Sequence, residues 1–187
     1  MKVHIFAIGG SAGSIKVLLQ VLPDLEKPDF PVLIVLHRAP NGPPVLQSLL
    51  ASYTKIPIFE AEDKTILESG CIYIAPADYH LLIEKDKSVT LDYSEKLNYS
   101  RPSIDVTFIF VAHVYKEGAL ALLLSGANED GVNGLGVIKN MGGIATVQDP
   151  KTCEVEYMPL QAINRGVVDM VIRPDEIASF INKLSVK

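Results

Sequence analysis

Uninterrupted apolar runs recur along this chain. Residues 3–8, 31–36, 71–75 and 119–124 carry almost no charged or amide side chain. A strand that is covered on both faces within a parallel sheet shows this pattern, whereas a strand with one face in water alternates apolar and polar residues. The runs therefore predict buried parallel strands.

Between these runs, apolar residues recur at three- and four-residue spacing, which is the repeat of a helix with one buried face. A short helix is also expected at 158–164, and further strands at 144–147 and 168–172. Because strands and helices alternate, the pattern predicts an α/β sandwich with a mostly parallel, Rossmann-like sheet. The helical stripes are Ile15, Leu18, Leu19 and Leu22; Leu46, Leu49 and Leu50; Ile104, Phe108, Val111 and Tyr115; Val132, Leu135, Ile138 and Met141; and Ile177, Phe180, Ile181 and Leu184.

Two segments depart from the parallel pattern. Pro57 lies within the run 56–59, and because proline is poorly tolerated in a central strand, we expect an edge strand there. Residues 79–84 and 88–93 flank a short polar turn and predict an antiparallel hairpin at one edge of the sheet. No internal repeat, linker or low-complexity tract interrupts the pattern, so residues 1–187 are expected to form a single domain.

The amino-acid composition argues against nucleic-acid binding, membrane insertion and metal binding. The 187 residues are 48% hydrophobic with a formal net charge of −5 and no basic run, so nucleic acid is not an expected partner. No apolar stretch reaches the ~20 residues that cross a bilayer, and no signal peptide precedes the first strand, so membrane insertion is not expected. Cys71 and Cys153 lie far apart and predict two free, buried thiols in a reducing, cytoplasmic setting. The histidines at 4, 80 and 113 show no metal-ligand spacing.

The stretch Gly9-Gly10-Ser11-Ala12-Gly13 joins the first predicted strand to the first predicted helix. It fits the pattern G-x-S-x-G, in which a serine hydroxyl is exposed at a sharp turn above a helix N-terminus. Two interpretations stand: a nucleophilic Ser11, or a glycine-rich turn that packs tightly or holds a phosphate. The dinucleotide pattern G-x-G-x-x-G is not met, because Ser11 takes the place of its second glycine, and this disfavours a nucleotide binder.

Reactive side chains follow three of the predicted parallel strands. Ser11 follows the first strand and Asp130 follows the strand at 119–124. His37 follows the second strand, just before a loop rich in proline, glycine and asparagine at 39–43. The carboxyl ends of parallel strands meet at the same edge of a sheet, so we expect these side chains to converge there.

A hydroxyl, an imidazole and a carboxylate are the three groups that serine hydrolases use for nucleophilic acyl transfer. In this interpretation Ser11 attacks, His37 removes its proton and Asp130 orients the imidazole, while backbone amides beginning with that of Ala12 hold the oxyanion. The structural alternatives are a buried strand-end histidine at position 37 and a helix N-cap at position 130. The order Ser…His…Asp differs from the Ser…Asp…His of α/β-hydrolases, so the serine motif does not indicate that class.

Ordered blocks along nearly the whole chain match those of one known family. They are the serine stretch 8–13, the strand that ends at His37 with Pro40 just downstream, and the segments 60–63, 73–80, 101–106, 124–131, 148–149 and 158–163. On these residues the chain resembles the catalytic domain of the bacterial chemotaxis protein-glutamate methylesterases of the CheB type.

This resemblance implies a three-layer α/β/α sandwich. It also implies hydrolysis of methyl esters on glutamate side chains of methyl-accepting chemotaxis-type receptors, with deamidation of receptor glutamines as a second activity. Ser11 is then the nucleophile, His37 the base and Asp130 the orienting carboxylate, with no cofactor or metal. Many members carry an N-terminal phosphoacceptor receiver domain, for which the residues before Ser11 leave no room, so control by a signalling regulator in trans is expected.

The sequence departs from the family's spelling near the expected triad. Ala12 stands where threonine is usual, and Ala127 where methionine is usual, followed by Asn128 in place of glycine. We expect Ala12 and Ala127 to shape oxyanion and substrate contacts. Arg101 is a candidate for substrate positioning, with anchoring of the polar segment 94–101 as its alternative. The alternative for the whole chain is a catalytically weakened, non-enzymatic adaptor that binds a receptor or signalling partner.

Overall fold

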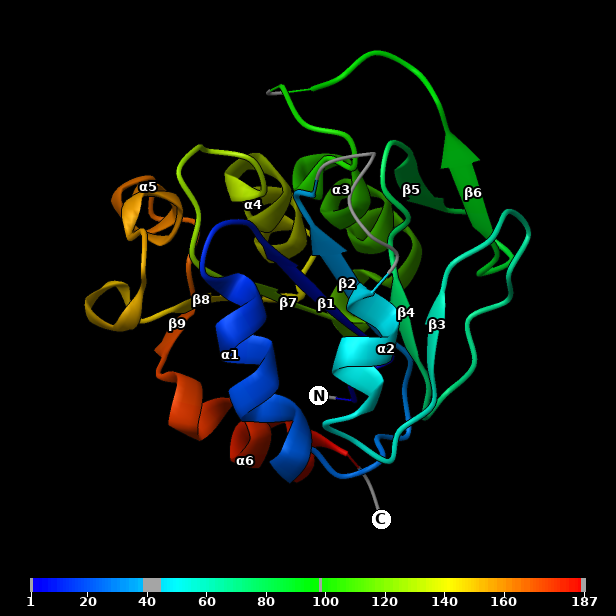
Figure 1. Cartoon of the computed structure of the whole chain (residues 1–187). Helices are drawn as coiled ribbons and strands as arrows, with labels where there is room; N and C mark the ends of the chain where they lie inside the picture. Colours follow the sequence, from blue (N-terminus) through cyan, green and yellow to red (C-terminus); the bar gives the residue numbers. More distant parts are fainter. Residues whose placement is uncertain (1, 39–44, 98, 186–187) are drawn as a thin grey trace.

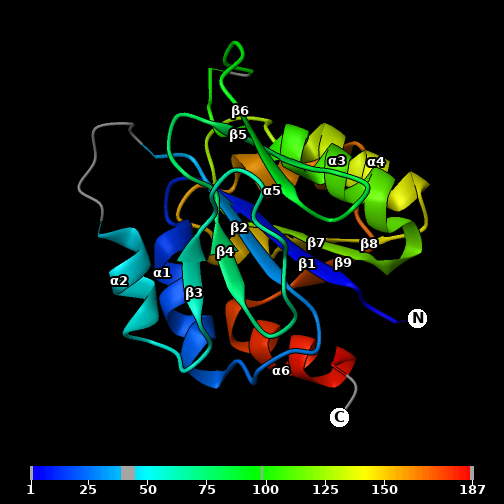
Figure 2. The same cartoon turned by 90° about the vertical axis from the view of Figure 1, so that its right-hand side faces the viewer.

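The computed structural model describes residues 2–38, 45–97 and 99–185. They form a seven-stranded parallel sheet with helices on both faces, and a separate two-stranded antiparallel sheet (Figures 1 and 2). The predicted α/β sandwich with a mostly parallel sheet is therefore confirmed. The strands of the large sheet, in spatial order, are β3 (Ile58–Glu60), β4 (Ile72–Ile74), β2 (Val32–Leu36), β1 (Ile5–Gly10), β7 (Ala119–Leu123), β8 (Ile144–Gln148) and β9 (Met170–Ile172).

Helices cover the sheet on both sides and create two apolar cores. The helices are α1 (Ser14–Val21), α2 (Leu46–Ala51), α3 (Ile104–Tyr115), α4 (Val132–Asn140), α5 (Tyr157–Asn164) and α6 (Pro174–Leu184), with 3₁₀ turns at Leu22–Asp24, Lys116–Gly118 and Pro150–Thr152. In β1, Ile5 and Ala7 belong to the core beneath α3, α4 and α5, whereas Phe6 and Ile8 belong to the core beneath α1, α2 and α6. Every residue of β1, β2 and β7 is buried, which explains why these strands read as unbroken apolar runs.

The order of the strands reverses beside β1. From β1 the sheet continues through β2, β4 and β3 on one side and through β7, β8 and β9 on the other. Open α/β sheets place their sites outside the carboxyl ends of the strands at such a reversal. Ser11 follows β1 directly, and the loop 124–131 follows β7, so both lie at this point of the molecule.

Strand β1 begins later than predicted and continues through Gly9 and Gly10. Gly10 lies opposite Leu36, and Gly9 lies between Val35 and the last residue of β7. A Cβ atom on Gly9 would lie 2.3 Å from Cγ2 of Ile104, so glycine here lets α3 approach the sheet closely. The expected glycine-rich turn is therefore shorter than the sequence pattern indicated, and it occupies residues 11–13.

The expected hairpin forms strands β5 (His80–Ile83) and β6 (Val89–Asp92), which pair antiparallel as predicted. It does not extend the edge of the parallel sheet but forms a sheet of its own that packs on α3. The reason is that Leu81, Ile83 and Val89 are buried in the same core as the apolar face of α3. The hairpin thus satisfies its apolar side chains against a helix instead of against a strand.

The buried face of α1 differs from the predicted stripe. Ser14, Val17, Leu18 and Val21 are buried, whereas Ile15 is 41% exposed. In this rotation Ser14 Oγ donates to the carbonyl oxygen of Ser125 at 3.0 Å, a contact that the spacing of apolar residues does not reveal.

The helices within the described ranges are too short or too polar to cross a membrane. The polar loop expected at 39–43, with Pro40, lies outside the described residues.

Candidate active site

Ser11 lies at the corner where β1 turns into α1. Its backbone N–H donates to the carbonyl oxygen of Ser125 at 2.9 Å and to Oγ of Ser14 at 3.0 Å. Gly13 has a φ of 82°, a left-handed conformation that glycine adopts at little cost. These contacts fix the backbone of Ser11, while its side chain stays partly exposed at the carboxyl edge of the sheet.

His37 lies beside Ser11 because β1 and β2 pair in parallel register. Gly10 is opposite Leu36, and the backbone N–H of His37 donates to the carbonyl oxygen of Gly10 at 3.1 Å. The first residues after the two strands are therefore neighbours. The side chain of His37 is 13% exposed, so its ring borders solvent while one edge faces the protein.

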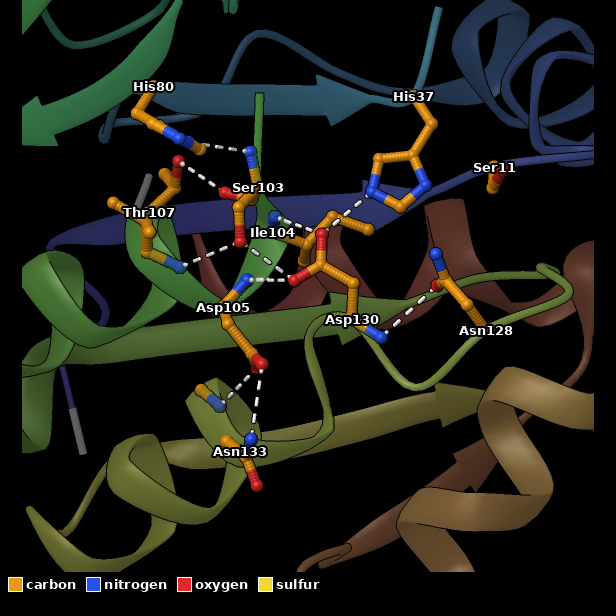
Figure 3. Close-up of polar contacts among 12 residues, drawn as sticks. Ser11, His37, His80, Ser103, Ile104, Asp105, Thr107, Asn128, Asp130 and Asn133 are labelled. Carbon is orange, nitrogen blue, oxygen red and sulfur yellow. Dashed lines mark hydrogen bonds and ion pairs between the residues drawn. The ribbon is translucent and has the colours of Figure 1, made fainter. Parts of the chain in front are cut away.

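The carboxylate of Asp130 is fully buried and accepts four hydrogen bonds (Figure 3). Oδ2 accepts from Nε2 of His37 and from the backbone N–H of Ile104, both at 2.7 Å. Oδ1 accepts from Oγ of Ser103 at 2.8 Å and from the backbone N–H of Asp105 at 3.0 Å. The two amides belong to the first turn of α3, where the helix dipole favours negative charge.

These contacts determine which nitrogen of His37 is basic. Burial alone raises the pKa of a carboxyl group, but the hydrogen bonds from His37, Asp105, Ile104 and Ser103 outweigh it and hold the pKa of Asp130 below its ordinary value. An ionised carboxylate only accepts hydrogen bonds, so Nε2 of His37 carries the proton of the 2.7 Å contact. In the neutral ring Nδ1 then holds the lone pair, and Figure 3 shows it on the side of the ring that faces Ser11.

The structure excludes the idea that Asp130 caps the helix that follows it. The N-cap of α4 is Gly131, which makes no side-chain capping bond. The carboxylate of Asp130 instead binds the first two residues of α3, which lie more than twenty residues earlier in the chain. Asp130 therefore links α3 to the imidazole of His37.

Ser103 binds the carboxylate of Asp130 directly, and His80 binds the backbone of Ser103. Ser103 is the N-cap of α3, and its Oγ accepts from the backbone N–H of Val106 at 3.4 Å while it donates to Asp130. Nδ1 of His80 accepts from the backbone N–H of Ser103 at 3.1 Å, and its Nε2 donates to the carbonyl oxygen of Glu95 at 2.9 Å. The sequence did not predict the contact of Ser103 with Asp130, because a local pattern of residues does not reveal which distant loop lies against the start of a helix.

The loop between β7 and α4 runs directly against the serine. A Cβ atom on Gly126 would lie 3.2 Å from Cβ of Ser11. In the same loop Ala127 is exposed, and Oδ1 of Asn128 accepts from the backbone N–H of Asp130 at 3.1 Å. Ala12 is also exposed. The oxyanion and substrate contacts expected of the two alanines stay predictions.

Arg101 is engaged with its own surroundings. Its Nε and Nη2 donate to Oδ1 of Asp78 at 3.1 and 2.7 Å, and its Nη1 donates to the carbonyl oxygens of Tyr93 and Ser94 at 3.1 and 2.6 Å. The guanidinium also lies over the ring of Tyr93, 3.8 Å from its centroid. These contacts join Arg101 to Asp78 and to the carbonyl groups of residues 93 and 94, and they favour the anchoring role. A direct contact of Arg101 with substrate stays a prediction.

Neither metal ligands nor reactive thiols accompany the site within the described ranges. Among those residues, no group of three histidine, cysteine or acidic side chains is placed to hold a metal ion. Both cysteines are free, and Cys71 is buried as expected, whereas Cys153 is only partly buried. Burial, with help from Asp149 and Glu156, raises the pKa of Cys153 to about 12, so its thiol stays protonated at neutral pH.

Comparison with known proteins identifies the family. A family profile described as CheB methylesterase matches residues 6–181. This chain belongs to the CheB methylesterase family. The resemblance inferred from the sequence blocks is therefore confirmed.

Relatives of this CheB methylesterase chain carry consistent names. A protein of Leptospira interrogans, provisionally named protein-glutamate methylesterase/protein-glutamine glutaminase, is 41% identical over 185 residues, which cover 98% of this chain and 96% of that one. The protein-glutamate methylesterase/protein-glutamine glutaminase of Trichodesmium erythraeum is 34% identical over 97% of this chain and 53% of its own length. The chain thus spans nearly all of the first relative and about half of the second.

The fold of this CheB methylesterase family member matches a solved relative. The crystal structure of the catalytic domain of Thermotoga maritima CheB methylesterase aligns with a TM-score of 0.93 at 33% identity, covering 98% of this chain and all of that one. The three-layer α/β/α sandwich implied by the resemblance is confirmed by this match.

Proposed function

We propose that this chain hydrolyses methyl esters of glutamate side chains, and amides of glutamine side chains, through a triad of Ser11, His37 and Asp130. The observation that carries the proposal is the 2.7 Å hydrogen bond between His37 Nε2 and the buried carboxylate of Asp130, beside the Ser11 corner. The names of the relatives, protein-glutamate methylesterase/protein-glutamine glutaminase, support this substrate class. In this proposal residues 1–187 act as one catalytic domain.

The reaction begins with a proton transfer from Ser11 Oγ to Nδ1 of His37, as the oxygen attacks the carbonyl carbon of the ester. Asp130 stabilises the imidazolium that forms, because its carboxylate is ionised and already bound to Nε2. The carbonyl oxygen becomes an oxyanion. The amide of Ala12, next to the nucleophile and before the N-terminus of α1, donates to it, and one such donor stabilises the transition state by about 3–4 kcal/mol.

Collapse of the tetrahedral intermediate breaks the bond to the methoxy oxygen, which takes the proton from His37 and leaves as methanol. The glutamyl carbonyl is then esterified to Ser11. A water molecule, deprotonated by His37, attacks this carbonyl, and the second collapse releases the free glutamate side chain and returns the proton to Ser11. With glutamine as substrate the first leaving group is ammonia.

The proposed substrate is a methyl-accepting chemotaxis-type receptor, with a signalling regulator in trans as a further partner. We place the activity in the cytoplasm, which the free thiols of Cys71 and Cys153 support, because such thiols persist in a reducing compartment.

The test is methanol release from a chemoreceptor fragment that carries radiolabelled methyl esters. We expect Ser11→Ala to lower the rate at least about a thousandfold, because the nucleophile is lost. Ser179→Ala is the matched control, since that hydroxyl donates only to the carbonyl oxygen of Glu176 on the exposed surface of α6.

Two outcomes would contradict the proposal. Unchanged methanol release by Ser11→Ala would remove the serine from the mechanism. Receptor binding without any methanol release by the wild type would instead indicate the non-enzymatic adaptor.

A further inference from the structure

Asn128 lies in the loop that connects the residue beside Ser11 to the residue that binds His37. It lies two residues after Gly126, whose added Cβ atom would come within 3.2 Å of Cβ of Ser11. It also lies two residues before Asp130, whose carboxylate binds His37. The loop thus runs close to Ser11 at Gly126 and to His37 at Asp130, and Asn128 lies between these two points of the chain.

One hydrogen bond fixes the orientation of this side chain. Oδ1 of Asn128 accepts from the backbone N–H of Asp130 at 3.1 Å. Because a backbone N–H only donates, the amide oxygen must be the atom that faces it, and the NH₂ group must point the other way. Figure 3 shows that nitrogen directed toward the side of the site where the ring of His37 and Ser11 lie.

The NH₂ group has no hydrogen bond to any residue that the structure describes. Asn128 is only partly buried, and it lies in the loop after β7 at the carboxyl edge of the sheet, where Ser11 is also partly exposed. A donor that is held in place before the reaction stabilises a developing negative charge without the cost of reorienting.

We propose that Nδ2 of Asn128 donates a hydrogen bond to the carbonyl oxygen of the scissile ester or amide as it becomes an oxyanion, together with the backbone amide of Ala12. This inference rests on the proposed function. It assigns to the side chain two separate tasks, since Oδ1 holds the loop while Nδ2 contacts the substrate.

The two tasks are separable by substitution. Asn128→Asp keeps an oxygen acceptor for the backbone N–H of Asp130 but has no donor when ionised. Asn128→Ser keeps a shorter acceptor for the same N–H, as serine does in comparable turns, and removes the amide without adding charge. Asn140→Ser is the matched control, since that exposed residue ends α4 at the opposite end from the site.

The assay is the steady-state release of methanol from the methylated chemoreceptor fragment, with kcat and KM measured separately across pH. We expect Asn128→Ser and Asn128→Asp to lower kcat about 10- to 100-fold with KM changed less than about threefold, because the donor acts in the transition state. The pH midpoint of kcat is expected to stay unchanged in Asn128→Ser, whereas the added carboxylate moves it in Asn128→Asp. Asn140→Ser should match the wild type.

Three results would overturn the inference. Wild-type kcat in Asn128→Ser would show that the donor is not used, while the proposed function would stand. A lower kcat in Asn128→Ser accompanied by a shifted pH midpoint or a lower Tm would show that the side chain acts only through the loop and Asp130. A wild-type protein that releases no methanol would refute the proposed function itself and the inference with it.

Discussion

Nε2 of His37 donates to the buried carboxylate of Asp130 at 2.7 Å, so the nitrogen that faces Ser11 is Nδ1. In the chymotrypsin-type triad the two nitrogens have the opposite assignment, with Nε2 on the serine. The difference follows from where each group lies in the fold. His37 follows the end of β2, and its backbone N–H donates to Gly10, the residue before Ser11. Asp130 lies in the loop after β7. One edge of the ring therefore binds the carboxylate, and the opposite edge faces the serine.

Replacement of the carboxylate tests this relationship. We expect Asp130→Asn to lower methanol release about 10³- to 10⁴-fold at neutral pH, because an amide no longer forces the proton onto Nε2 and no longer stabilises the imidazolium. The variant should also lose about 1–3 kcal/mol of unfolding free energy, since one backbone amide at the start of α3 loses its charged acceptor. Asp175→Asn on the exposed start of α6 is the control. Activity within tenfold of the wild type would contradict the assigned role.

The unfolding free energy at acidic pH depends on the carboxylate of Asp130. The pKa of Asp130 is lowered in the folded protein despite its burial, so the stabilisation is present above the unfolded pKa of about 3.9 and is lost as pH falls through the folded pKa. The difference in unfolding free energy between the wild type and Asp130→Asn should therefore be largest near neutral pH and shrink below about pH 3.9. Denaturant titrations at several pH values measure it.

Asp105 is expected to change the stability of the protein with pH in the opposite direction to Asp130. Burial raises its pKa, helped by the charge of Asp130, so Asp105 takes up a proton at a higher pH in the folded protein than in the unfolded chain. Relative to Asp105→Asn, the wild type should gain stability as pH falls through the raised pKa. The same titrations measure both variants. If the difference in unfolding free energy from the wild type changed with pH in the same direction for Asp130→Asn and Asp105→Asn, the assigned signs would be wrong.

Ser103 couples helix capping to the site. Ser103→Ala removes the hydroxyl that caps α3 and donates to Asp130 at 2.8 Å. We expect a loss of about 0.5–2 kcal/mol in unfolding free energy and a several-fold fall in kcat, because the carboxylate keeps its other three donors. Ser48→Ala, which removes an exposed hydroxyl on α2, is the comparison. A change in stability with kcat fully retained would separate the cap from the chemistry.

Gly126 tests how tightly the loop is placed against the nucleophile. The added methyl of Gly126→Ala would lie 2.4 Å from Cε of Met158 and 3.2 Å from Cβ of Ser11. The end of the methionine side chain can move, but Ser11 can make room only by leaving its position. We therefore expect kcat to fall about 10- to 100-fold with a small change in Tm. Gly136→Ala within α4 should keep its activity; a normal kcat for Gly126→Ala would show that the loop yields instead of the serine.

Arg101 distinguishes two roles that the sequence left open. If it anchors the segment 94–101, Arg101→Ala should increase amide hydrogen exchange at residues 93–97 about tenfold or more, because its contacts to Asp78 and two carbonyls are lost. Arg101→Lys should not restore protection, since one ammonium cannot span all three acceptors. A raised KM with unchanged exchange would indicate substrate positioning instead.

Much of the fold follows from the pattern of side chains. The central strands were predicted because both faces of β1, β2 and β7 are covered, and a strand buried on both faces must be apolar throughout. The rotation of α1 and the position of the hairpin were not predictable in this way. Both depend on partners far away in the chain: the carbonyl of residue 125 for α1, and α3 for the hairpin.

The sequence by itself determined which chemical groups stand at the ends of the strands, because Ser11, His37 and Asp130 each follow an apolar run that can only be a buried strand. Only the tertiary structure decided how they meet. The helix dipole and amides of α3 keep Asp130 ionised, that charge selects the proton position on His37, and the loop that carries Asp130 also orients Asn128. These relations join segments dozens of residues apart, and hydrogen-bond geometry between such segments is set by packing, which no local pattern encodes.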